Sequence, residues 1–215
     1  TAAGSWAARR PQSNAAYAER YRAAVARIAE AEKRLAPGKA GLAEAAARYL
    51  FKLMAIKDEY EVARLYTDGS FARQLAATFE GDLKLEYQMA PPILGRRDPA
   101  TGAPAKSSFG PWLTPAMRVL ARLKGLRGTP LDLFGRTHER RMERQLLADY
   151  EARLSEIERG LTPEKHGVAL ALLSLPEKIR GFGHVKARHV EAARAEEATL
   201  MERWRAPAAA PLAAE

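Results

Sequence analysis

The sequence has no cysteine among its 215 residues. This removes disulfides, thiolate nucleophiles, iron–sulfur ligation and most structural zinc sites from the chain. It also has no run that approaches the roughly 20 consecutive apolar residues of a membrane-spanning helix, and its first residues lack the apolar segment of a signal peptide. We therefore expect a cytoplasmic protein with no membrane partner.

Aromatic residues are scarce, at 7% of the chain, whereas hydrophobic residues reach 47% with alanine supplying many of them. This bias favours helices over β-sandwiches. Lys and Arg number 35 against 26 Asp and Glu, a net charge of +9 that attracts anionic partners. Because most of these charges alternate in sign and lack neighbouring aromatics, we expect solvated helix surfaces and no nucleic-acid partner. The chain starts at Thr1 without Met, so we expect a domain cut from a longer polypeptide.

Apolar residues recur at helical spacing along most of the chain, between proline and glycine stops. One pattern, from Leu42 to Ala63, alternates steps of four and three like a coiled-coil seam and predicts one helix packed on the first. The predicted helices are residues 15–36, 42–63, 71–79, 114–125, 137–160, 163–175 and 185–204.

The apolar period changes to two from Leu83 to Met89, as a half-buried strand requires. Residues 95–104 have the composition of a turn, and residues 106–109 can return as a second strand. The predicted fold class is therefore mainly α, with several amphipathic helices and one small β-hairpin at about residues 83–110. We expect three segments: a helical extension over 1–36, a helical domain over 37–205 and a flexible Ala/Pro tail over 206–215.

The stretch RGFGHVK combines two glycines with basic and imidazole side chains at a predicted helix start, where backbone N–H groups can bind an anion. The residues of this candidate site are Arg180, Gly181, Gly183, His184 and Lys186. The favoured alternative is a glycine join between two helices, because loop glycines often serve geometry alone.

Metal or acid–base catalysis has weaker support. The four histidines, at 138, 166, 184 and 189, lack the i, i+4 spacing that puts two ligands on one helix face, so no metal is expected. Carboxylates crowd the run from Lys57 to Glu61, but they more simply form surface ion pairs, Glu61 with Lys57 and Arg64 with Tyr60 or Glu61. We expect no catalytic residue in this chain.

Four longer segments occur in a fixed order: LMAIKDEYEVARLYTDGSF (53–71), APPILGRRDPATGAPAKSSFGPW (90–112), LKGLRGTPLDLFGRTHERRMER (123–144) and LPEKIRGFGHVK (175–186). Together they resemble the C-terminal domain of the fused, single-chain indolepyruvate:ferredoxin oxidoreductases of bacteria. The resemblance covers about residues 40–200.

The resemblance implies a parent enzyme that converts aryl-pyruvate and CoA to acyl-CoA, CO₂ and reduced ferredoxin. The thiamine diphosphate, Mg²⁺ and 4Fe–4S clusters of that reaction would lie in other domains, with no cofactor in this one. We expect an accessory domain that contacts those other domains within a homo-oligomer. Two alternatives stay open: docking of ferredoxin at Arg140, Arg141 and Arg144, and binding of a CoA phosphate at the RGFGHVK stretch.

Overall fold

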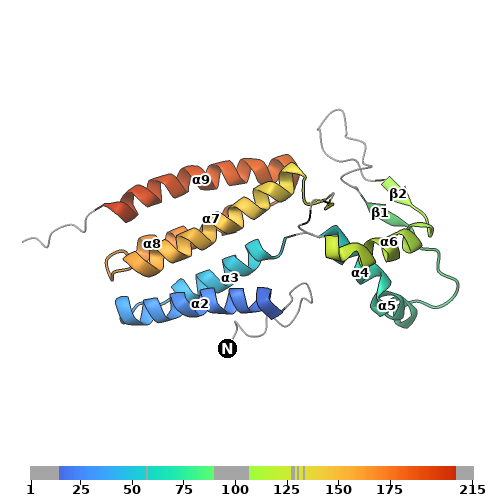
Figure 1. The fold of residues 1–215 in the computed structure, drawn as a ribbon, viewed down its shortest axis with the longest axis horizontal. Helices are drawn as coiled ribbons and strands as arrows, with labels where there is room; N and C mark the ends of the chain where they lie inside the picture. The colour runs from blue at the N-terminus through green and yellow to red at the C-terminus, as the bar shows by residue number, and fades with distance from the viewer. Residues whose placement is uncertain are drawn as a thin grey trace, which may run out of the picture. The chain divides into compact units, whose positions relative to one another are not determined.

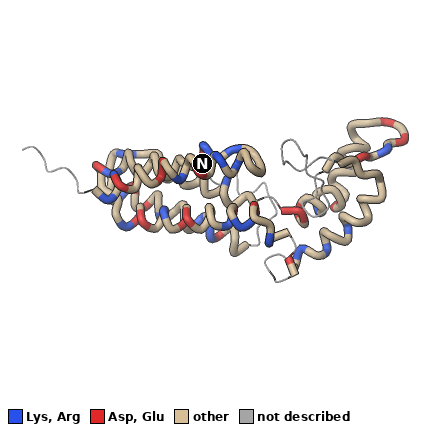
Figure 2. Tube along the Cα trace, turned by 90° about the horizontal axis from the view of Figure 1, so that it is seen from above, with Lys and Arg blue, Asp and Glu red and all other residues tan. Residues whose placement is uncertain are grey.

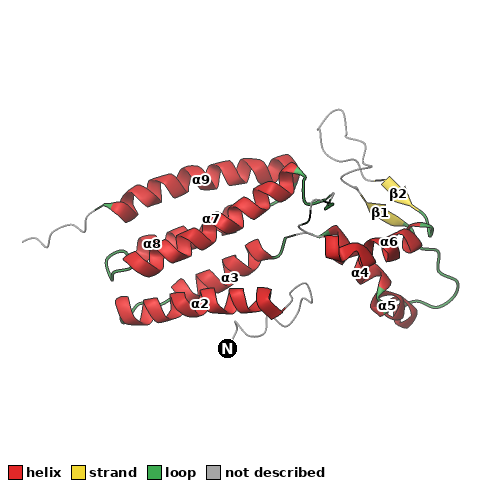
Figure 3. Cartoon of the chain, in the orientation of Figure 1, coloured by secondary structure: helices red, strands yellow, loops and turns green. Residues whose placement is uncertain are grey.

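The computed structural model describes residues 15–56, 58–89, 107–126, 129, 131–132 and 134–206, and it confirms a mainly helical fold with one β-hairpin in these residues. Figures 1 and 3 show the helices and the two short strands. Contacts divide the chain into two compact units, residues 1–56 with 143–215, and residues 57–142. We call the first the bundle unit and the second the hairpin unit, and describe each by itself.

The bundle unit consists of long helices that lie side by side (Figure 1). Its elements are α2 (Ala15–Leu35), α3 (Leu42–Met54), most of α7 (His138–Gly160), α8 (His166–Ser174), the 3₁₀ helix η2 (Leu175–Lys178) and α9 (Gly183–Arg205).

Each of these helices turns apolar side chains toward a shared core. The largest side chains that are almost completely buried are Ile28, Leu42, Leu50, Leu154, Ile157, Leu172 and Leu173. Small residues such as Ala46 and Ala169 are also fully buried and allow the helices to approach closely. Burial of this apolar surface is the main source of stability in the unit.

A buried carboxylate joins three helices of this unit. Glu32, at the end of α2, accepts hydrogen bonds from the first amides of α3, Leu42 N at 2.8 Å and Ala43 N at 3.1 Å. Its other contact is Nε2 of His166 on α8, at 2.8 Å. Burial acts to raise the pKa of Glu32, but the bonds from His166 and the two amides outweigh it and leave the pKa below its ordinary value.

Surface ion pairs also connect the bundle helices. Arg27 of α2 contacts Glu158 of α7 at 3.1 Å, and Arg153 of α7 contacts Glu197 of α9 at 2.8 Å. Figure 2 shows basic and acidic residues interleaved along these helices, as the sequence predicted. A pair at the surface such as Arg27 with Glu158 contributes at most about 1 kcal/mol.

The hairpin unit contains α4 (Glu59–Thr67), α5 (Ser70–Thr78), β1 (Tyr87–Met89), β2 (Ser107–Phe109), α6 (Leu113–Arg122) and the 3₁₀ helix η1 (Leu123–Leu126). The two strands are antiparallel, with Tyr87 opposite Phe109. A small core of Ala63, Tyr87 and Met117 holds the helices against the hairpin.

The prediction of one helix over residues 42–63 is wrong. The helix ends at Met54, Ala55 leaves the helical conformation, and a new helix begins at Glu59 in the other unit. Asp58 starts this second helix by accepting a hydrogen bond from Tyr60 N at 3.0 Å. The apolar spacing continues across the break, which is why periodicity alone joined two helices into one.

The other predicted elements agree more closely. The hairpin is confirmed, although only residues 87–89 and 107–109 pair and the expected turn over 95–104 lies outside the described residues. The expected helical extension over residues 1–36 falls in the bundle unit. Its helix α2 packs in the core of that unit, where Ile28 is 1% exposed. Of the tail, only residue 206 is described. In the described residues no helix has the length and hydropathy to cross a membrane.

Candidate functional site

The join between η2 and α9 carries the predicted RGFGHVK stretch, and both glycines have geometric reasons to be there. Gly181 has φ +84°, and a Cβ on it would lie 2.9 Å from Cγ1 of Val185. Gly183 has φ +55°. Residues with a side chain rarely adopt such angles, so the tight entry into α9 depends on glycine whether or not a ligand binds.

The start of α9 is electropositive. Its first turn has no acidic residue and instead carries His184 and Lys186, and the residue before the helix, Phe182, provides no side-chain cap. A helix N-terminus has a partial positive charge, so cations are unfavourable there and anions are favourable.

Lys52, in the last turn of α3, is a third cation in this neighbourhood, together with Arg180 and Lys186. Its Nζ donates to the carbonyl oxygen of Pro176 at 2.6 Å. Burial lowers the pKa of Lys52, and the positive charges of Arg180 and Lys186 lower it further, whereas Glu177 acts to raise it. We call Lys52, Arg180 and Lys186 the cationic cluster.

Acidic residues partly neutralise the cluster. Lys186 Nζ lies 2.5 Å from Glu143 Oε1 on α7. Arg180 lies 3.7 Å from Glu177, whose carboxylate also accepts a hydrogen bond from the Tyr49 hydroxyl at 2.8 Å. Glu143 and Glu177 therefore face Lys186 and Arg180, whereas Lys52 donates to a backbone carbonyl.

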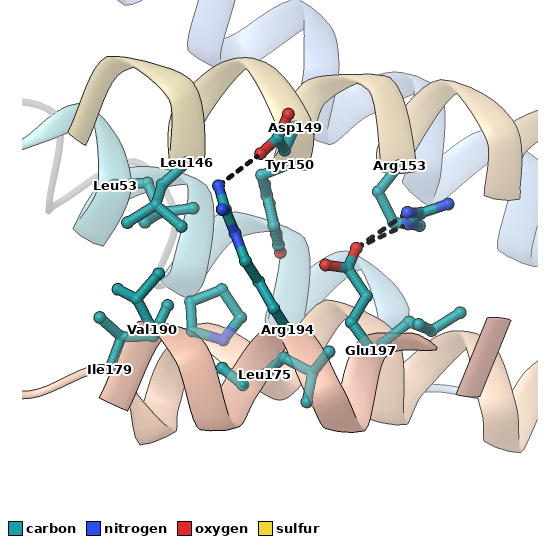
Figure 4. A pocket seen from close by; sticks show the side chains of 13 residues that line it. Leu53, Leu146, Asp149, Tyr150, Arg153, Leu175, Ile179, Val190, Arg194 and Glu197 are labelled. Atoms are coloured by element: carbon teal, nitrogen blue, oxygen red, sulfur yellow. Dashed lines mark hydrogen bonds and ion pairs between the residues drawn. The ribbon is translucent and has the colours of Figure 1, made fainter. Parts of the chain in front are cut away.

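A small cavity lies beside the cluster, between α7 and α9 (Figure 4). Its wall is mostly apolar, and two ion pairs border it, Asp149 with Arg194 at 3.5 Å and Arg153 with Glu197 at 2.8 Å. The cavity volume of about 40 Å³ suits ordered water, whereas pockets for organic ligands measure about 300–1,000 Å³. The lining residues are Leu53, Leu146, Asp149, Tyr150, Arg153, Leu172, Leu175, Pro176, Ile179, Val190, Ala193, Arg194 and Glu197.

Two of the other histidines and the carboxylates singled out in the sequence have structural partners. His166 contacts Glu32, and Nδ1 of His189 lies 2.8 Å from the carbonyl oxygen of Arg180. Glu61 pairs with Arg64 at 2.7 Å, while Lys57 lies outside the described residues. No group of three His, Cys, Asp or Glu residues in the described part of the chain is arranged to hold a metal ion.

The three arginines proposed for docking differ in accessibility. Arg140 is 8% exposed and contacts Glu59 at 3.0 Å within the hairpin unit. Arg140 is therefore less accessible to a partner protein than the other two arginines. Arg141 and Arg144 are exposed.

Sequence reasoning missed Lys52 and Tyr49. Both lie on α3, more than 120 positions before the η2 segment that they contact. No local motif marks either residue, because a lysine or tyrosine near a helix end is common in any amphipathic helix. Only the packing of α3 against η2 brings them to the cluster.

Comparison with known proteins gives a family match. The model of a family of unknown function, DUF6537, matches residues 12–199. Neither a curated protein nor a solved structure matches the chain. The matched range covers the hairpin unit, most of the bundle unit and the whole cationic cluster.

Proposed function

The chain belongs to the DUF6537 family, and we propose that it is a non-catalytic accessory domain of a cytoplasmic indolepyruvate:ferredoxin oxidoreductase. In this proposal it stabilises the assembled enzyme, and the thiamine diphosphate, Mg²⁺ and iron–sulfur clusters lie in other domains. The enzyme as a whole converts aryl-pyruvate and CoA to acyl-CoA, CO₂ and reduced ferredoxin.

A scaffolding role is supported most directly by the buried polar side chains, which join helices to one another. Glu32 joins α2, α3 and α8, and the buried Tyr150 hydroxyl donates to the carbonyl oxygen of Leu173 at 3.0 Å. Burial raises the pKa of Tyr150, which keeps it a neutral donor. These groups are already used to join helices, whereas catalytic groups must be open to a substrate.

Removal of the chain from the full-length oxidoreductase tests this proposal. The deletion enzyme is compared with the intact enzyme and with a surface control, Arg22→Ala, whose side chain is exposed. We expect the deletion to dissociate the oligomer and to abolish reduction of both a viologen dye and ferredoxin. Full activity with both acceptors would contradict the proposal, and loss of ferredoxin reduction alone would indicate a docking module.

A second candidate function, binding of an anion such as a CoA phosphate, is favoured by the cationic cluster. Lys52 and Lys186 come from different helices, and the charges of Arg180 and Lys186 both act on Lys52 beside the electropositive start of α9. An exposed phosphate could approach Arg180, whose side chain is 71% exposed. The cavity is too small for the rest of CoA, so only the phosphate would be bound here.

Arg180→Gln tests this second function in the full-length enzyme, because the exposed Arg180 has little part in the core. We expect the KM for CoA to rise by about fivefold, the effect of one lost charge-assisted hydrogen bond, while the KM for aryl-pyruvate stays constant. Lys178→Gln is the matched control, since Lys178 is also exposed and pairs with Glu196 instead. Equal KM values for CoA in the two variants would refute phosphate binding at the cluster.

A further inference from the structure

One face of α6 exposes a row of apolar side chains. Trp112, Val119 and Leu123 are 61%, 56% and 43% exposed, and the exposed Ala116 lies between them in sequence. Steps of four, three and four residues place all four within an arc of about 60° on a helix. We call this row the α6 stripe.

A different face of α6 is apolar because it packs in the core of the hairpin unit. Leu113, Met117 and Leu120 pack in the small core, and Met117 is 5% exposed. The α6 stripe lies next to this face and remains open. An amphipathic helix usually needs only one apolar face, so the second one requires its own explanation.

Trp112 has an aromatic contact although it is exposed. Its indole ring makes an edge contact with Phe109, with ring centroids 5.9 Å apart. A tryptophan that is ordered before binding loses little side-chain entropy on contact, and tryptophan is among the residues that dominate protein interfaces.

The sequence around the stripe carries charge of one sign. Residues 99–131 contain five Lys or Arg and no Asp or Glu, in contrast to the alternating charges of the bundle helices. Two of these cations, Arg118 and Arg122, are exposed and lie one turn apart along one edge of the stripe. The surface therefore combines an apolar centre with a positive edge.

These features fit a protein groove better than other occupants. Apolar side chains at i, i+4, i+7 and i+11 are typical of a helix that binds in an apolar groove. Arg118 and Arg122 would be complemented by acidic residues at the edge of that groove. A second copy of the stripe would bring like charges together. A membrane surface is less suitable, because α6 has only 10 residues and its widest apolar face is used in the core.

We propose that the α6 stripe docks into an apolar groove edged by Asp or Glu on another domain of the oxidoreductase, with Arg118 and Arg122 facing the acidic edge. The identity of the partner rests on the proposed function, whereas the chemistry of the surface does not. The docking would fix the hairpin unit against the enzyme.

Site-specific photo-crosslinking in the full-length enzyme tests this inference. The photoreactive residue p-benzoylphenylalanine replaces Val119, and mass spectrometry identifies the attached peptide. We expect a crosslink to a segment with apolar residues beside Asp or Glu, reduced about tenfold when Arg118→Glu and Arg122→Glu are added. The matched control is Arg73→Glu, an exposed arginine of α5 in the same unit, which should leave the crosslink unchanged.

The other outcomes also decide the question. Attachment to lipid, attachment to the stripe of a second copy, no crosslink, or a crosslink that persists after charge reversal would each overturn the inference. A charge-dependent crosslink to an acid-edged groove of a different protein would support the docking surface and refute its assignment to the oxidoreductase.

Discussion

At the scale of single residues, Glu32 has the most consequential contacts in the bundle unit. Its carboxylate accepts from two amides that begin α3 and contacts His166, all within 3.1 Å. The variant Glu32→Ala lacks this carboxylate, so the two amides and His166 lose their buried hydrogen-bond partner. We expect a loss of about 2–4 kcal/mol in the free energy of unfolding, measured with urea.

Glu44→Ala is the control for this loss, because Glu44 is an exposed carboxylate on the neighbouring helix and pairs with Arg48 at 2.9 Å. It should change the free energy of unfolding by no more than about 0.5 kcal/mol. Equal losses in the two variants would mean that Glu32 does not join the helices as described.

The lowered pKa of Glu32 also predicts a pH dependence. Its ordinary value is 4.5, and in the folded chain the pKa lies below this. The unfolded chain therefore binds the proton first as the pH falls, and the stabilisation by the carboxylate is present above pH 4.5 and is lost below it. The stability difference between the wild type and Glu32→Gln should shrink as the pH falls from 5 to about 3. A difference that stays constant would contradict the assigned hydrogen bonds.

Two glycines of the bundle unit should respond in opposite ways to alanine. Gly181→Ala places a methyl group 2.9 Å from Val185 at a positive φ, and we expect it to lower the free energy of unfolding by about 1–3 kcal/mol. Gly167 is the second residue of α8 and faces open space, so Gly167→Ala should raise it by about 0.5–1 kcal/mol through the lower entropy of the unfolded chain. Thermal unfolding followed by circular dichroism measures both, and the same sign for both would contradict the backbone geometry.

At the scale of elements, the start of α4 depends on its cap. Asp58→Ala removes the acceptor for Tyr60 N and should cost about 1 kcal/mol. Hydrogen exchange of the first amides of α4 should accelerate, while amides in the core of α3 keep their protection. Asp82→Ala, in an exposed loop of the same unit, is the control. Unchanged exchange in Asp58→Ala would mean that another contact begins the helix.

Most helices could be predicted from sequence because proline, glycine and capping residues mark their ends, as Thr137 does for α7. The break between α3 and α4 was missed, although Asp58 followed three positions later by Glu61 has the pattern of a capping box. The site was predicted only in part. Arg180 and Lys186 lie in one local stretch, but Lys52 reaches them through tertiary packing that no local pattern encodes.

At the scale of the whole molecule, the two units have separate cores. All buried residues of the larger core belong to the bundle unit, although residues 57–142 interrupt it in sequence. Replacement of these residues by a flexible Gly/Ser linker of about 12 residues should therefore leave a cooperatively unfolding helical bundle. Loss of cooperative unfolding in this variant would show that the bundle requires the hairpin unit.

If the proposed function is right, the stability of this domain supports the oxidoreductase as a whole. Ile157 is fully buried, and Ile157→Val should lower the free energy of unfolding by about 1 kcal/mol without exposing a polar group. The most direct measurement is the temperature of half-inactivation of the full-length enzyme, assayed with a viologen dye and with ferredoxin. We expect it to fall by about 2–4 °C in Ile157→Val and to rise in Gly167→Ala, equally for both acceptors. Inactivation temperatures that stay constant while the isolated chain changes its own melting temperature would contradict the claim.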